Sequence, residues 1–66
     1  MASVGEARVR VDFNPEQNPY VGEIKRASAA LIDLCEELKG KDPRLAALAQ
    51  TAFEEGAMWA VKAATA

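Results

Sequence analysis

The segment Lys39-Gly40-Lys41-Asp42-Pro43 decides the fold of this 66-residue chain. A lysine followed by glycine is typical of a helix end, because a cation suits the negative end of the helix dipole and glycine suits the C′ position. Asp-Pro is typical of a helix start, because aspartate caps free N–H groups and proline is tolerated at the first helical position. Two helices joined by so short a connection fold back on each other. The segment therefore predicts an antiparallel two-helix hairpin.

The helices of this hairpin are expected over residues 19–39 and 43–64. Asn18-Pro19 repeats the cap-then-proline signal at the first of them. Heptad spacing along that helix predicts a stripe that packs on the other helix, made of Tyr20, Ile24, Ala27, Leu31, Leu34 and Leu38. Beside it, a second row widens the apolar face, namely Val21, Ser28, Ile32 and Cys35.

The second helix repeats the same spacing in Leu45, Ala49, Ala52, Gly56, Trp59 and Ala63. This places Trp59 in the predicted core. Apolar residues also lie elsewhere around the helix, and a helix that is apolar nearly all round is expected to be buried nearly all round. A two-helix protein cannot bury it alone, so this helix is the expected centre of a homo-oligomer.

Residues 7–13 alternate apolar and polar side chains without error. Such alternation predicts a half-buried β-strand. The sequence contains no second alternating run, so a strand here would have to pair with another copy of the chain. Without that pairing, the segment would be an extended arm. The steps Asn14-Pro15 and Asn18-Pro19 end it before the first helix, because a residue before proline avoids the helical region.

The composition also points to association between copies. Half of the residues are hydrophobic, but fourteen of them are alanine. A chain this short and alanine-rich usually needs disulfides, a metal or a partner chain to be stable. With Cys35 as the one cysteine and no histidine, no intramolecular disulfide or usual zinc site can form. We therefore expect residues 1–66 to form one mainly α domain that assembles as a homo-oligomer.

Several function classes are disfavoured. The absence of histidine removes the commonest general base and the Ser-His and Cys-His arrangements. A net charge of −2 argues against broad DNA binding, which needs a clustered basic surface. No uncharged run approaches the ~20 residues of a membrane span, and residues 1–6 lack a signal-peptide pattern. The expectation is a cytosolic protein that is not an enzyme and uses no metal or cofactor.

Few side chains remain as binding candidates. Phe13 and Tyr20 could stack on a ring, or could pack as ordinary residues beside the cap of the first helix. Lys25 and Arg26 could hold phosphate, although such a pair is more often a solvated face. Arg44 lies in the first turn of the second helix, where the dipole disfavours a cation, and so suggests an anionic partner.

The stretch Leu48-Ala49-Gln50-Thr51-Ala52-Phe53-Glu54-Glu55-Gly56-Ala57-Met58-Trp59-Ala60 resembles the second-helix signature of a phage family of helical hairpins. These are the sponges that counter the CBASS and Thoeris antiviral systems, the second anti-CBASS and first anti-Thoeris proteins. The resemblance extends to three upstream stretches, which are Glu23-Ile24-Lys25, Leu31-Ile32-Asp33-Leu34-Cys35-Glu36 and Val11-Asp12-Phe13-Asn14-Pro15.

The resemblance implies a hexamer in the cytoplasm of an infected bacterium. It implies that the hexamer binds cyclic oligonucleotide or cyclic ADP-ribose-type signals without cleaving them. In the family, cyclic dinucleotides sit between protomers, where an aromatic residue before the first helix stacks on a base and a lysine meets phosphate. Phe13 matches the aromatic residue, with Tyr20 as a competitor, and Lys25 matches the lysine. Asn14, next to Phe13, is also expected to bind the ligand.

A second type of site in the family takes cyclic trinucleotides and uses an arginine at the start of the second helix. Arg44 falls on that position. The threonine that accompanies this site in the family is replaced here by Ala27 and then Ser28. The alternative to a sponge is an oligomeric structural module, or one that docks its alanine-rich face on a host protein.

Overall fold

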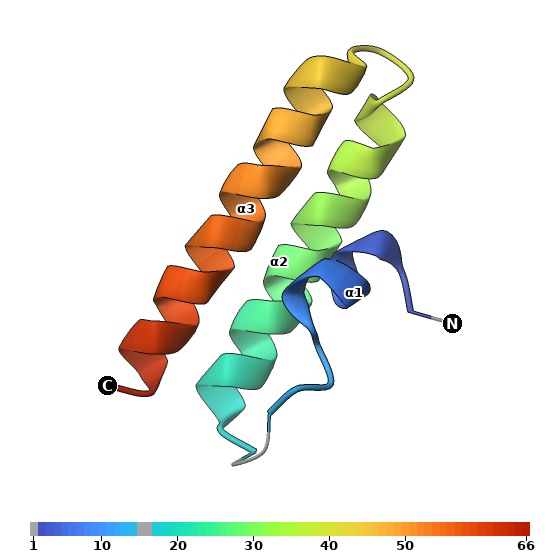
Figure 1. The fold of residues 1–66 in the computed structure, drawn as a ribbon. Helices are drawn as coiled ribbons and strands as arrows, with labels where there is room; N and C mark the ends of the chain where they lie inside the picture. Colours follow the sequence, from blue (N-terminus) through green and yellow to red (C-terminus); the bar gives the residue numbers. More distant parts are fainter. Residues whose placement is uncertain (1, 15–16) are drawn as a thin grey trace.

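The protein is a helical hairpin with a short third helix laid across it (Figure 1). The computed structural model describes residues 2–14 and 17–66. The long helices, α2 (Pro19–Leu38) and α3 (Pro43–Ala64), run antiparallel beside each other. The mainly α hairpin predicted from the turn segment is therefore confirmed. Within the described ranges, no helix combines the length and apolar character that a membrane crossing requires.

Side-chain caps define where the long helices begin. The side-chain oxygen of Asn18 accepts hydrogen bonds from two backbone N–H groups in the first turn of α2, the nearer at 2.9 Å. The Asp42 carboxylate accepts one from the first turn of α3 at 3.0 Å. Lys39 is the C-cap of α2 in a right-handed helical conformation, and Gly40 follows it without a positive φ. The turn thus depends on its caps and does not use the left-handed freedom of glycine.

The contact stripes predicted for the two helices are wrong in register. Leu34 is 57% exposed and Trp59 is 58% exposed, although both were expected to be buried. The buried residues lie outside the two heptad stripes: Val21, Gly22, Lys25, Ala29, Ile32 and Cys35 on α2, and Ala46, Gln50 and Ala57 on α3. Three of them, Val21, Ile32 and Cys35, belong to the second apolar row predicted beside the α2 stripe. Two of the buried residues, Lys25 and Gln50, are polar. Apolar periodicity therefore favours the neighbouring rows of each helix, which carry more apolar side chains.

Residues 7–13 form neither the predicted strand nor an extended arm. Helix α1 (Val4–Val9) covers the first part of the segment, and a turn follows it. The physical reason is a capping box, in which the Ser3 hydroxyl accepts from the Glu6 N–H at 3.1 Å and the Glu6 carboxylate accepts from the Ser3 N–H at 2.8 Å. This pair satisfies two N–H groups at the start of α1. The described residues contain no strand.

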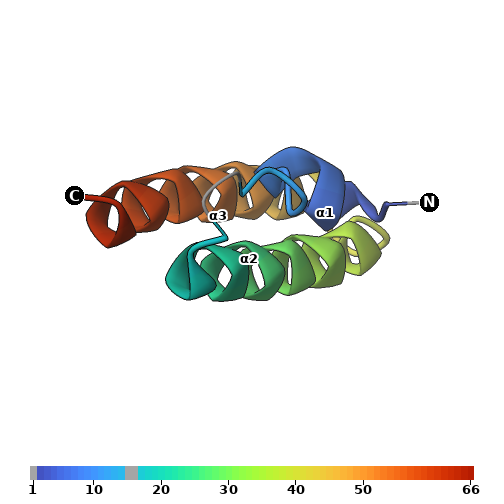
Figure 2. The same cartoon turned by 90° about the horizontal axis from the view of Figure 1, so that it is seen from below.

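Helix α1 lies over α2 and beside α3 (Figures 1 and 2). Its backbone touches α2 directly, because a Cβ atom added to Gly5 would stand 2.0 Å from the carbonyl oxygen of Ala29. The Gly5 N–H donates a hydrogen bond to the Asp33 carboxylate at 2.7 Å. Val9 then completes a small core with Ala29, Ile32 and Ala57. The core of the chain is therefore shared by three helices.

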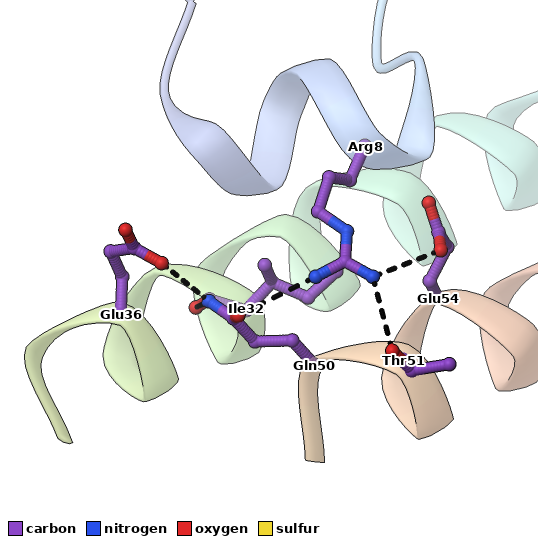
Figure 3. A network of polar contacts seen from close by, with 6 residues as sticks. All are labelled: Arg8, Ile32, Glu36, Gln50, Thr51 and Glu54. Atoms are coloured by element: carbon purple, nitrogen blue, oxygen red, sulfur yellow. Dashed lines mark hydrogen bonds and ion pairs between the residues drawn. The ribbon is translucent and has the colours of Figure 1, made fainter. Parts of the chain in front are cut away.

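A buried amide links these helices (Figure 3). Gln50 of α3 is 1% exposed, and its Nε2 donates to the Ile32 carbonyl at 3.0 Å and to the Glu36 carboxylate at 2.8 Å on α2. Its Oε1 accepts from the guanidinium of Arg8 on α1 at 3.4 Å. Hydrogen bonds to both ends of the amide remove the usual penalty for burying it.

Candidate functional site

The first part of the candidate site lies where the turn after α1 meets the beginning of α2. The Phe13 ring is 63% exposed, and the Lys25 ammonium lies 5.3 Å from its centroid. A cation at this distance from an aromatic face is attracted by the ring quadrupole. The fold thus brings together an open aromatic face and a cation that are twelve residues apart in the sequence. Such a pair could stack on a flat base and attract a phosphate.

Lys25 also has a structural position that the sequence did not predict. Its side chain is buried, with 7% of the residue exposed, so the interpretation as a solvated face is wrong. The ammonium donates to the carbonyl oxygens of Phe13 and of Arg10, the latter at 3.1 Å. These two bonds hold the turn after α1 against α2. Lys25 therefore determines where the Phe13 ring lies.

The remaining predicted residues near this end surround the cap of α2. The Asn14 side chain forms two hydrogen bonds with the backbone of Asn18, donating to its carbonyl at 2.9 Å and accepting from its N–H at 3.0 Å. Tyr20 lies in the first turn of α2 and is 68% exposed. Arg26 is exposed, and its guanidinium lies over Gly22, 3.1 Å from where a Cβ atom would stand. Asn14 thus shapes the cap, while Tyr20 and Arg26 face solvent.

Arg44 lies apart from these residues. It is exposed in the first turn of α3, at the end of the hairpin opposite to the start of α2. Since each helical residue advances about 1.5 Å, Arg44 and Lys25 are separated by about 20 Å along the hairpin. One chain therefore does not place Arg44 in the same site as Phe13 and Lys25.

A groove of about 590 Å³ adjoins the pair on the side of α3. Basic residues at the end of α1 and on α2 border it, namely Arg8, Arg10 and Lys25. Apolar residues of α3 form much of its wall, including Ala57, Met58 and Val61. This groove was not predicted, because residues 7–13 were expected to form a strand or an extended arm. The signal that could have found it is the Ser3-Val4-Gly5-Glu6 pattern, which is typical of a capping box.

Two of the charged residues around the groove, Arg8 and Glu54, pair with each other. The Arg8 guanidinium lies 3.1 Å from the Glu54 carboxylate and also reaches Thr51 at 3.4 Å (Figure 3). Both members of the ion pair are partly exposed, so its contribution to stability is below about 1 kcal/mol. Further along, hydrogen bonds from Lys39 and then Gln50 hold the pKa of the Glu36 carboxyl below its usual value.

The groups that surround the groove are cations, carboxylates, the Thr51 hydroxyl and apolar side chains. Cys35 is buried away from them against the core side of α2. Across the described part of the chain, no three His, Cys, Asp or Glu side chains form a cluster that could hold a metal ion.

The comparison with known proteins finds one protein family. A family model described as Acb2/Tad1, hairpin domain, matches residues 5–65. No curated protein and no solved structure matches the chain. The matched range includes α2, α3 and nearly all of α1, so it covers both the Phe13–Lys25 pair and the groove.

Proposed function

Because the chain belongs to the Acb2/Tad1 hairpin-domain family, whose members are anti-CBASS and anti-Thoeris sponges, we propose that it sequesters cyclic nucleotide signals without cleaving them. It would act in the cytoplasm of a bacterium infected by a phage and lower the free concentration of the signal. The observation that carries the proposal is the match over residues 5–65. The family is a non-catalytic, sponge-type domain.

The arrangement of Phe13 and Lys25 supports this function. An exposed ring offers a stacking surface, and stacking on an aromatic side chain contributes about 1 to 3 kcal/mol per base. The turn after α1 uses two of the three N–H donors of the Lys25 ammonium, which leaves the third to donate to phosphate. Such a charge-assisted hydrogen bond contributes about 1.5 to 3 kcal/mol. Two copies of each contact, around a ligand with two bases and two phosphates, would sum to about 5 to 12 kcal/mol before the costs of association. The upper part of this range corresponds to nanomolar affinity.

Two equivalent sets of contacts require more than one copy of the chain, and the surface supports such an assembly. Among residues 2–14 and 17–66, ten large hydrophobic residues are exposed, namely Val4, Phe13, Tyr20, Leu31, Leu34, Leu38, Leu45, Leu48, Met58 and Trp59. Surface patches of this kind mark sites of protein association. We propose a homo-oligomer, a hexamer in line with the family resemblance, with the nucleotide held between protomers. Arg44 would then meet its ligand at a second type of site, where several chains converge.

Titration calorimetry with a panel of cyclic dinucleotides and cyclic ADP-ribose isomers tests the proposal. The wild-type protein is expected to bind at least one member. Phe13→Ala should weaken that binding about tenfold or more, because it removes a stacking surface and the ring is too exposed to be needed for folding. Tyr20→Ala is the matched control for an exposed aromatic residue in the same region, and decides which ring stacks.

The variant Lys25→Glu is not a suitable test, because Lys25 holds the turn after α1 and its loss would disturb the site indirectly. Failure of the wild-type protein to bind any member of the panel would contradict the proposal. In that case the exposed apolar rows would favour the alternative, a structural or host-protein-binding module.

A further inference from the structure

Arg10 has a backbone conformation that suits another residue better. It is the C-cap of α1 and lies in the left-handed region, with φ 54° and ψ 59°. Glycine is the usual residue in this conformation at a helix end, because a Cβ atom crowds the neighbouring carbonyl oxygen. An arginine here therefore destabilises the fold slightly relative to glycine. A strained residue next to a groove calls for an explanation in terms of its side chain.

Arg10 is exposed at the end of α1. Its guanidinium forms no hydrogen bond or ion pair with residues 2–14 or 17–66. The other two cations that border the groove are engaged: Arg8 binds Glu54, and Lys25 donates to two carbonyl oxygens of the turn. Arg10 thus contributes the positive charge that the described chain leaves unpaired at this place.

The position of Arg10 also links two hollows of the surface. It borders the groove of about 590 Å³ beside α3, whose wall includes Ala57, Met58 and Val61. It also borders a shallower hollow of about 380 Å³ that Phe13 lines. Small-molecule sites commonly combine an apolar wall of this extent with a few polar groups, in volumes of roughly 300 to 1,000 Å³. A nucleotide whose base or sugar lies in either hollow would have its phosphate near the Arg10 guanidinium.

We propose that Arg10 is a phosphate-binding residue of the nucleotide site, and that the groove beside α3 takes the sugar or base attached to that phosphate. The proposal rests on the proposed function and names a further residue for it. A guanidinium binds phosphate oxygens through two parallel N–H donors, which a lysine cannot reproduce. The strained backbone at Arg10 is then the energetic cost of placing the guanidinium at the boundary of the two hollows.

The variant Arg10→Gly separates this role from a structural one, because its two effects have opposite signs. Thermal unfolding should show a higher midpoint than for the wild type, since glycine relieves the strain. Calorimetry with the cyclic dinucleotide that the wild type binds best should show affinity reduced by about tenfold to a hundredfold. Arg10→Lys should retain part of the affinity. Lys41→Ala, which removes an exposed cation at the far end of the hairpin, is the control and should leave the affinity unchanged.

Three outcomes would overturn the assignment. If Arg10→Gly binds the dinucleotide as tightly as the wild type, Arg10 does not contact phosphate, and the proposed sponge function stands without it. If the variant loses its oligomeric mass together with its affinity, Arg10 pairs with another copy of the chain instead. If the wild type retains no cyclic nucleotide at all, the proposed function fails and the role of Arg10 fails with it.

Discussion

At the scale of single residues, polar side chains in buried places determine how this chain is arranged. Gln50 is nearly inaccessible, yet both ends of its amide have partners on other helices. Lys25 is buried with its ammonium against backbone carbonyl oxygens. Neither position can be identified from apolar periodicity, because a polar residue at a buried position looks like a solvated one in the sequence. That is why apolar periodicity missed these two buried positions.

We predict that Gln50→Leu destabilises the protein by about 1 to 3 kcal/mol, because it keeps the side-chain volume but leaves Arg8 and Glu36 without their buried partner. Urea unfolding at constant protein concentration measures the change. Thr51→Val is the neighbouring control, since its exposed hydroxyl accepts one long bond at 3.4 Å and should matter by less than about 0.5 kcal/mol. Equal losses in the two variants would contradict the role given to Gln50.

The candidate site was predictable only in part, for reasons that also lie at the residue scale. The resemblance pointed to Phe13 and Lys25, and the structure places the two side chains in contact. The anchoring of the turn by Lys25 was not predictable, since it depends on where α1 ends. The groove that Arg10 borders was missed for the same reason.

At the scale of elements, α1 shows how local capping can override a periodic pattern. The alternation over residues 7–13 is a complete strand pattern, but a lone strand has no ladder partner in the same chain. The capping box at Ser3 and Glu6 gives the segment an alternative that satisfies its backbone locally. By contrast, the caps that start α2 and α3 accept from N–H groups two or three residues further along the chain, and so could be predicted from the sequence.

Gly5→Ala should detach α1 from the hairpin. Its methyl group would stand 2.0 Å from the Ala29 carbonyl oxygen, and backbone atoms cannot yield as a flexible side chain would. We expect a loss of about 1 to 3 kcal/mol in the free energy of unfolding. Faster amide hydrogen exchange over residues 4–9 should accompany it.

Gly40→Ala is the matched control for this prediction. A Cβ atom at Gly40 would be 3.7 Å from the Glu37 carbonyl oxygen, an ordinary contact, and the position has no positive φ. If Gly5→Ala unfolds at the same denaturant concentration as Gly40→Ala and the wild type, the close contact of α1 with α2 at Gly5 is contradicted.

At the scale of the whole molecule, the chain is too flat to enclose its own apolar side chains. Its Cα trace extends 38 × 25 × 12 Å, so its shortest dimension is less than half of each of the other two. The leucines at positions 31, 34 and 38 of α2, with Trp59 of α3, are left in solvent. These residues belong to the two heptad stripes that were predicted to be buried. They fit a core that several copies of the chain would complete.

We predict that light scattering, measured as the protein elutes from a size-exclusion column, gives a mass several times the 7.1 kDa of one chain. A hexamer would have a mass of about 43 kDa. Leu34→Glu should lower this mass, because it places a charge in an apolar row that the single chain leaves 57% exposed. Lys41→Glu, which adds an acidic side chain at an exposed position in the turn, is the control for charge alone. A wild-type protein of monomeric mass would contradict the assembly.

The most direct test of the central claim is the recovery of intact ligand from the protein. The purified protein is incubated with a cyclic dinucleotide and filtered to remove free nucleotide, then heated so that it unfolds and releases what it holds. Mass spectrometry of the released material identifies it. We expect the nucleotide to be retained before heating and recovered chemically unchanged afterwards. Recovery of linear or hydrolysed nucleotide, or passage of the ligand through the filter for every cyclic nucleotide in the panel, would contradict it.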